Sequence, residues 1–111
     1  MVVKAHLLRV AIKSYMEVIM SSTNGFPSKG WLKCSDISEG MFPNEYAVES
    51  ITADNAEFSL FAHKTLVNEK EKLLKVTILD CRDDVCLVIL PNEAYGVFKN
   101  MITVKIENIS R

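Results

Sequence analysis

The feature of this sequence that most constrains its fold is a change in hydrophobic period near residue 30. Before this point apolar residues recur every three or four positions. After it they alternate with polar residues in short segments separated by turn residues. A period near 3.6 is typical of a helix, and a period of two is typical of a strand with one buried face. The sequence therefore predicts a mainly β protein (α+β) behind one N-terminal helix.

Residues 1–20 are predicted to form that helix, because two stripes repeat with the same period on opposite faces. The apolar stripe is Ala5, Leu8, Ile12, Tyr15, Met16 and Ile19, and the polar stripe is His6, Arg9, Lys13 and Glu17. Asn24-Gly25 followed by Pro27 is typical of a helix end. Met1, Met16 and Met20 are alternative natural starts, and the sequence does not decide between them.

Six strands are predicted after the linker at 21–30, namely residues 31–37, 45–52, 56–63, 74–81, 85–90 and 101–108. No helix-period segment between them could connect parallel strands, so the strands are expected to be antiparallel. Closure removes exposed edges, and we therefore expect a small barrel, or a strongly bent sheet, over residues 31–111. The three predicted units are the helix at 1–20, the linker at 21–30 and this barrel-like domain.

Size and charge limit the classes of function. A chain of 111 residues with 49% hydrophobic and 24% charged residues is typical of one globular domain. Its net charge of −1 disfavours nucleic acid as a partner, because phosphate binding usually needs a positive excess. Charged residues interrupt the apolar N-terminal segment, so neither a membrane-spanning helix nor a signal peptide is expected.

The three cysteines are Cys34, Cys81 and Cys86. An odd number in a short chain is untypical of a secreted disulfide framework, so we expect free thiols in a reducing cytoplasm. Three alternatives remain open: a zinc site that includes His63, a functional redox pair, and a disulfide between Cys81 and Cys86 across a hairpin in an oxidising setting. The zinc alternative lacks a typical Cys knuckle, and we predict no metal and no cofactor.

No catalytic arrangement is recognisable, and we predict that the protein is not an enzyme. His6 lies on the polar face of the predicted helix and His63 ends a strand, so neither is placed beside a nucleophile. There is no Gly-x-Ser-x-Gly elbow and no glycine-rich phosphate loop. The aspartates near residue 82 are expected to be exposed turn residues.

Two loops carry unusual apolar residues and provide the candidate ligand or partner surface: Met41, Phe42, Tyr46, Tyr95 and Phe98. These side chains are either tucked into the barrel end, which is our expectation, or displayed for contact with a protein or small ligand. Gathered at one barrel end, the aromatic residues would line a shallow pocket.

Aromatic residues beside lysines also resemble single-stranded nucleic-acid sites. Trp31 lies between Lys29 and Lys33, and Phe98 precedes Lys99. In a chain of negative net charge, these two isolated clusters are explained equally well as core aromatic residues flanked by solubilising lysines. This interpretation therefore ranks below protein contact.

The sequence favours a non-enzymatic binding or structural module that acts through a protein partner or through its own copies. The alternative is a small-barrel nucleic-acid-binding or regulatory accessory protein, and an enzyme with a site between subunits ranks third. Apolar residues surround the whole axis of the predicted helix 1–20. A helix that is apolar on all sides needs packing partners on more than one side, so we predict a homo-oligomer that buries it.

The alternation also predicts an inward-facing set in the last three strands: Val76, Ile78, Val88, Leu90, Ile102 and Val104. Val104→Asp should lower the melting temperature strongly, because burying an unpaired carboxylate adds to a packing loss of about 2–5 kcal/mol. Lys105→Ala should change the free energy of unfolding by less than about 0.5 kcal/mol. An unchanged melting temperature in Val104→Asp would place the register one residue away.

Overall fold

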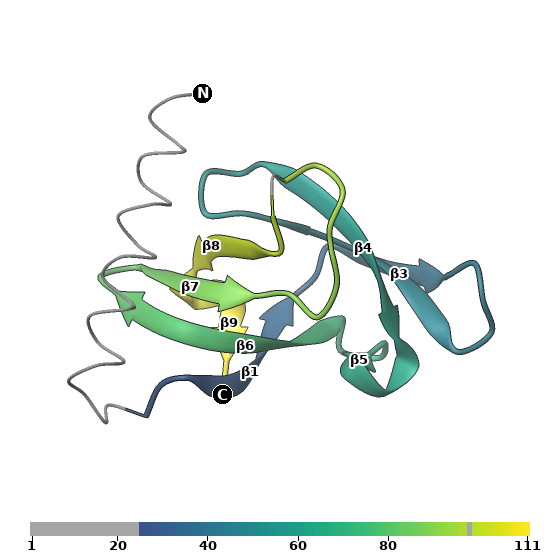
Figure 1. Ribbon diagram of the computed structural model, residues 1–111, viewed down its shortest axis with the longest axis horizontal. Coiled ribbons are helices and arrows are strands. Elements are labelled where there is room, and N and C mark those ends of the chain that lie inside the picture. Colours follow the sequence, from purple (N-terminus) through teal and green to yellow (C-terminus); the bar gives the residue numbers. More distant parts are fainter. Residues whose placement is uncertain (1–24, 98) are drawn as a thin grey trace.

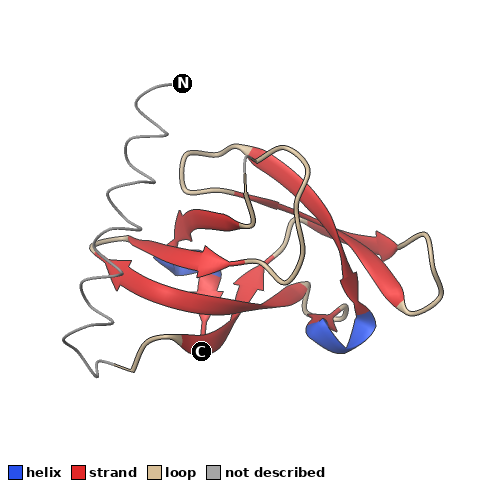
Figure 2. Ribbon diagram, viewed as in Figure 1, coloured by secondary structure: helices blue, strands red, loops and turns tan. Residues whose placement is uncertain are grey.

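The computed structural model describes residues 25–97 and 99–111, which form two antiparallel sheets (Figures 1 and 2). The six-stranded sheet contains β1 (Ser28–Lys33), β5 (Val67–Asn68), β6 (Leu73–Arg82), β7 (Val85–Ile89), β8 (Met101–Lys105) and β9 (Ile109–Ser110). The three-stranded sheet contains β2 (Asp36–Glu39), β3 (Glu45–Ile51) and β4 (Glu57–His63). Two 3₁₀ turns are η1 (Lys64–Leu66) and η2 (Ile106–Asn108). The predicted helix at 1–20 lies outside the described residues.

The mainly β, antiparallel prediction is confirmed, but the described residues form no closed barrel. The larger sheet has the order β8-β7-β6-β1-β9, with β5 also paired to β6, and the smaller sheet has the order β2-β3-β4. Isolated backbone contacts cover parts of their edges: Ala53 N donates to Thr103 O, and Ser59 and Tyr95 exchange two hydrogen bonds. These contacts protect edges without a continuous ladder between the sheets.

The chain passes from one sheet to the other at Cys34-Ser35, within the segment predicted as one strand at 31–37. Cys34 N donates to Lys72 O beside the larger sheet, and Ser35 N donates to Glu49 O in the smaller one. The buried Ser50 hydroxyl donates to Lys33 O at the same crossing. A single predicted strand therefore becomes β1 and β2, because its two halves pair with different neighbours.

β1 begins at Ser28, so the last three residues of the predicted linker belong to a strand. Gly30 indicated a flexible segment in the sequence, but in the fold it permits close packing. A Cβ at this position would lie 2.4 Å from Ile78 Cδ1 and 2.9 Å from Ser110 O. Only glycine leaves room for both neighbours, which a sequence cannot reveal.

The core lies between the two sheets and draws on both. Its buried members include Leu32, Leu74, Val48 and Leu60. The six predicted inward residues are all buried, with exposures of 5% or less, which confirms the register of β6, β7 and β8. Three consecutive residues of β7 (Cys86, Leu87 and Val88) are buried, as expected for a strand covered on both faces.

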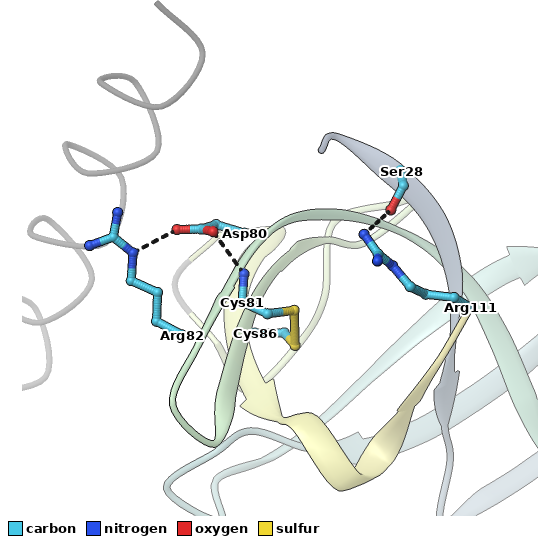
Figure 3. The surroundings of a disulfide bond; sticks show 6 residues. All are labelled: Ser28, Asp80, Cys81, Arg82, Cys86 and Arg111. Carbon is cyan, nitrogen blue, oxygen red and sulfur yellow. Dashed lines mark hydrogen bonds and ion pairs between the residues drawn. A yellow bond between two sulfur atoms is a disulfide. The ribbon is translucent and has the colours of Figure 1, made fainter. Parts of the chain in front are cut away.

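Cys81 and Cys86 form a disulfide, which corrects the prediction that both are free (Figure 3). The two residues lie directly opposite each other across the β6–β7 hairpin, with their Cα atoms 4.1 Å apart. Cross-strand neighbours approach closely enough for this bond. Disulfides persist mainly in oxidising compartments, so the cysteine count no longer supports a cytoplasmic location.

Cys34 remains a buried free thiol and donates a hydrogen bond to Leu32 O. Burial raises the pKa of the Cys34 thiol from 9.0 to about 12, because desolvation disfavours the thiolate. A neutral thiol of this kind behaves as a small apolar side chain. Within the described residues the structure contains no helix with the length and hydropathy needed to cross a membrane.

Thiol titration tests the pairing. In denaturant without reductant, the protein should show one reactive thiol per chain rather than three, because only Cys34 is free. Cys34→Ser should abolish that signal. Reduction should lower the free energy of unfolding by about 2 kcal/mol, the value for a short closed loop. Three reactive thiols in the unreduced protein would contradict the disulfide.

The pKa of Cys34 predicts a loss of stability at alkaline pH. The unfolded chain releases the Cys34 proton above its ordinary pKa of 9.0, whereas the folded chain retains it up to about 12. The contribution is therefore complete below pH 9 and declines as pH rises toward 12. Between about pH 8 and about pH 10.5, urea denaturation should show a loss of about 2 kcal/mol that Cys34→Ala lacks. Equal losses in both proteins would exclude Cys34 as the cause.

Candidate functional site

Met41 and Phe42 lie together in the loop between β2 and β3, at the right-hand end of Figure 1. Their exposures are 75% and 63%, so the expectation that they are tucked into the fold is wrong. Tyr46 already covers the inner face at this end of the small sheet and packs against the core. The loop extends beyond that point, and its two apolar side chains are displayed.

Glu45 fixes the backbone of this loop. Its Oε1 atom accepts hydrogen bonds from Met41 N at 3.1 Å and from Phe42 N at 3.3 Å. Its backbone accepts from Gly40 N and donates to Phe42 O. A Cβ on Gly40 would approach Glu45 Cγ to 2.7 Å, so glycine allows the chain to fold over this side chain. The exposed residues are therefore carried by an ordered turn.

The base of the loop is attached to the end of β4. Lys64 N donates to Asn44 O, and the Lys64 ammonium lies 3.2 Å from Glu39 Oε2 and 4.7 Å from the centre of the Tyr46 ring. A hydrogen bond with the Glu69 side chain raises the pKa of Tyr46, because it favours the neutral phenol. Tyr46 is thus a half-buried support for the loop rather than part of its displayed surface.

Tyr95 is 68% exposed, but it lies on a different loop. Its backbone pairs with Ser59 near the middle of β4, whereas the Met41-Phe42 loop lies beyond the far end of that strand. Gly96, with φ +95°, follows it and passes close to Glu57 O, where a Cβ would approach to 2.5 Å. The structure therefore separates Tyr95 from Met41 and Phe42. Phe98 lies outside the described residues.

Tyr95 borders an open groove of about 400 Å³ on the small sheet. Two carboxylates, Glu49 and Glu57, and the hydroxyl-bearing Ser59 belong to its lining. Apolar side chains such as Phe58 also line the groove, and none of the other candidate residues that the structure describes belongs to it.

Two of the polar residues considered from the sequence, His63 and Asp80, have local structural partners. His63 ends β4 as predicted, and its Nδ1 atom accepts from Thr65 N at 3.2 Å. Asp80 pairs with Arg82 at 3.0 Å on the β6–β7 hairpin. Among residues 25–97 and 99–111, no group of three His, Cys, Asp or Glu side chains is placed to hold a metal ion.

Sequence reasoning missed Glu45, which orders the displayed loop. A glutamate that follows a Gly-Met-Phe-Pro-Asn segment resembles any surface acid until its carboxylate is seen to accept backbone hydrogen bonds. The only signal was its position at the start of a predicted strand, within reach of a turn. Backbone N–H groups in turns need such acceptors.

Comparison with protein-family models, with curated proteins and with solved structures found no match to the chain. No activity, substrate or partner can be transferred from another protein. The function is therefore argued from the displayed loop and from the distribution of charge on the sheets.

Proposed function

We propose that this protein is a non-enzymatic binding module that inserts Met41 and Phe42 into an apolar pocket of a protein partner. The observation that carries the proposal is the exposure of these two large side chains on a turn held by Glu45. Aromatic residues and methionine are enriched in protein interfaces, and single buried anchors dominate many of them.

The two side chains supply a useful part of a binding free energy. Full burial of a Phe or Met side chain contributes about 1.5–3 kcal/mol, so burying the exposed fractions contributes about 3 kcal/mol together. This corresponds to roughly a hundredfold in affinity. The hydrogen bonds to Glu45 lower the cost of ordering the loop on binding, which is the advantage of a preformed contact.

A protein pocket fits this loop better than a membrane surface. Glu45 follows the two apolar residues at the start of β3, and Glu39 at the end of β2 is paired with Lys64, so this end of the sheet has no positive excess. Anionic lipid surfaces attract clusters of Lys and Arg and repel carboxylates. A protein partner with an apolar pocket and a basic or neutral rim would match both the apolar residues and the neighbouring carboxylates of this loop.

Self-association through residues 1–20 is a second route to protein contact, and it rests on the apolar residues around the predicted helix. Light scattering at micromolar concentration tests it separately, because a monomer has a mass of 12.5 kDa. A monomeric full-length chain would reject self-association and leave the proposal for the loop unaffected.

Photo-crosslinking tests the docking proposal in extract from the source cells. A benzoylphenylalanine at position 42 of the full chain should crosslink a partner that the same group at position 106 does not reach. Ile106 is a suitable control because it is also exposed, at 44%, but lies on η2. Unlabelled wild-type protein should compete, whereas Met41→Ser/Phe42→Ser should compete about a hundredfold less well.

A third variant tests the role of the ordered turn. Glu45→Ala keeps both apolar side chains but removes the acceptor, so it should compete about fivefold less well, the effect of roughly 1 kcal/mol. All variants should keep the wild-type circular dichroism spectrum. Equal competition by the wild type and the Met41→Ser/Phe42→Ser variant, or identical crosslinks at positions 42 and 106, would reject the proposal.

A further inference from the structure

The outer face of β1 and the adjoining part of β6 gathers three lysines around the only tryptophan of the chain. Leu32 of β1 faces the core, so its neighbours Trp31 and Lys33 face outward, as does Lys29. Antiparallel pairing places Lys75 of β6 directly opposite Trp31. We name Lys29, Trp31, Lys33 and Lys75 the basic face.

The contacts within the basic face leave its positive charges available. The Lys75 ammonium lies 6.0 Å from the centre of the Trp31 ring, and Lys29 Nζ donates to Thr77 Oγ1 at 2.7 Å. Neither lysine, nor Lys33, forms an ion pair with any residue that the structure describes. A lysine above an aromatic ring can swing aside, because its stem is flexible and its ammonium is hydrated.

No carboxylate occupies the outward positions around this cluster. The outward residues of β5, β9 and the start of β6 are Asn68, Ser110, Leu73 and Thr77. The turn at 69–72 alternates Glu with Lys and adds no net charge. By contrast, Asp36 lies opposite Glu49 on the outer face of the small sheet. Three lysines thus lie together with no carboxylate at the adjoining outward strand positions, in a protein whose net charge is −1.

We propose that the basic face binds single-stranded nucleic acid, with one base stacked on Trp31 and backbone phosphates beside Lys29, Lys33 and Lys75. This activity goes beyond docking of the Met41-Phe42 loop and does not depend on it. Alternate residues of a strand are about 6.6–6.8 Å apart, so the lysines flank the ring along the strand. Aromatic platforms flanked by cations are the usual means of binding single strands without sequence preference.

A single strand fits this face better than a duplex or a lipid surface. The bases of a duplex are already stacked on one another and cannot reach a ring held in a sheet. Trp31 is half-buried in the face, whereas insertion into lipid needs an aromatic side chain that projects from the surface.

The fluorescence of the full chain provides a direct test, because Trp31 is its only tryptophan. Titration with a twelve-nucleotide oligo(dT) should quench the fluorescence as a base stacks on the ring. The logarithm of the binding constant should fall with the logarithm of the salt concentration with a slope of about −2, as expected for three lysine–phosphate contacts with a single strand. Heparin and phosphatidylserine vesicles serve as anionic probes without bases.

Matched variants separate stacking from charge. By fluorescence anisotropy of a labelled oligo(dT), Trp31→Ala should bind roughly 5- to 150-fold more weakly, whereas Trp31→Phe should retain most of the affinity. Lys33→Gln should reduce the magnitude of the salt slope by about 0.7, and Lys105→Gln on β8 should leave it unchanged. Circular dichroism of each variant should match the wild type.

Three results would overturn the proposal. The first is unchanged Trp31 fluorescence at oligo(dT) concentrations at which the anisotropy assay shows saturated binding. The second is equal binding by Trp31→Ala and wild type, which would indicate attraction of any polyanion. The third is binding of phosphatidylserine vesicles with no binding of oligo(dT), which would assign the face to membranes. None of these results bears on the Met41-Phe42 loop, because its competition assay uses other residues.

Discussion

The packing of two sheets across one apolar core determines where the remaining side chains of the described strands can point. Because side chains alternate along a strand, burying Leu32 and Val76 directs Trp31, Lys33 and Lys75 away from the core. The same rule places Tyr46 on the inner face of β3. The basic face is therefore a consequence of the register, and a shift of one residue would exchange core and surface.

Periodicity predicted the strands well because it is a local property with a strong physical cause. The bounds of β3 and β4 agree with the predicted segments to within one residue at each end, and the inward residues of β6, β7 and β8 are as expected. What the sequence could not supply depends on contacts between distant segments. Gly30 resembles a linker residue until Ile78 is seen to occupy the space of its absent side chain.

The predictions of a closed barrel and of free cysteines were wrong for related reasons. The expected barrel needs a ladder between the sheets, but the chain crosses at Cys34-Ser35, and in the part of the chain that the structure describes the edges meet through isolated contacts such as Ala53 with Thr103. An odd cysteine count suggested free thiols, whereas the register of one hairpin places Cys81 opposite Cys86. The candidate site could likewise be predicted only in part. Met41 and Phe42 were recognisable as unusual residues, but their exposure and their support by Glu45 depend on the loop geometry.

The two surfaces rely on opposite physical effects. Burial of Met41 and Phe42 is driven by the removal of apolar surface from water, and its strength depends little on moderate salt. The proposed attraction of phosphates to the basic face would depend on counterion release, and it would weaken as salt rises with a slope of about −2 for three lysine contacts. The two surfaces share no residue and lie on different sheets, and such separate sites usually contribute independently. On these two proposals, one chain would hold a protein at the loop over a range of salt concentrations, whereas its affinity for a nucleic acid at the sheet would fall as the salt concentration rises.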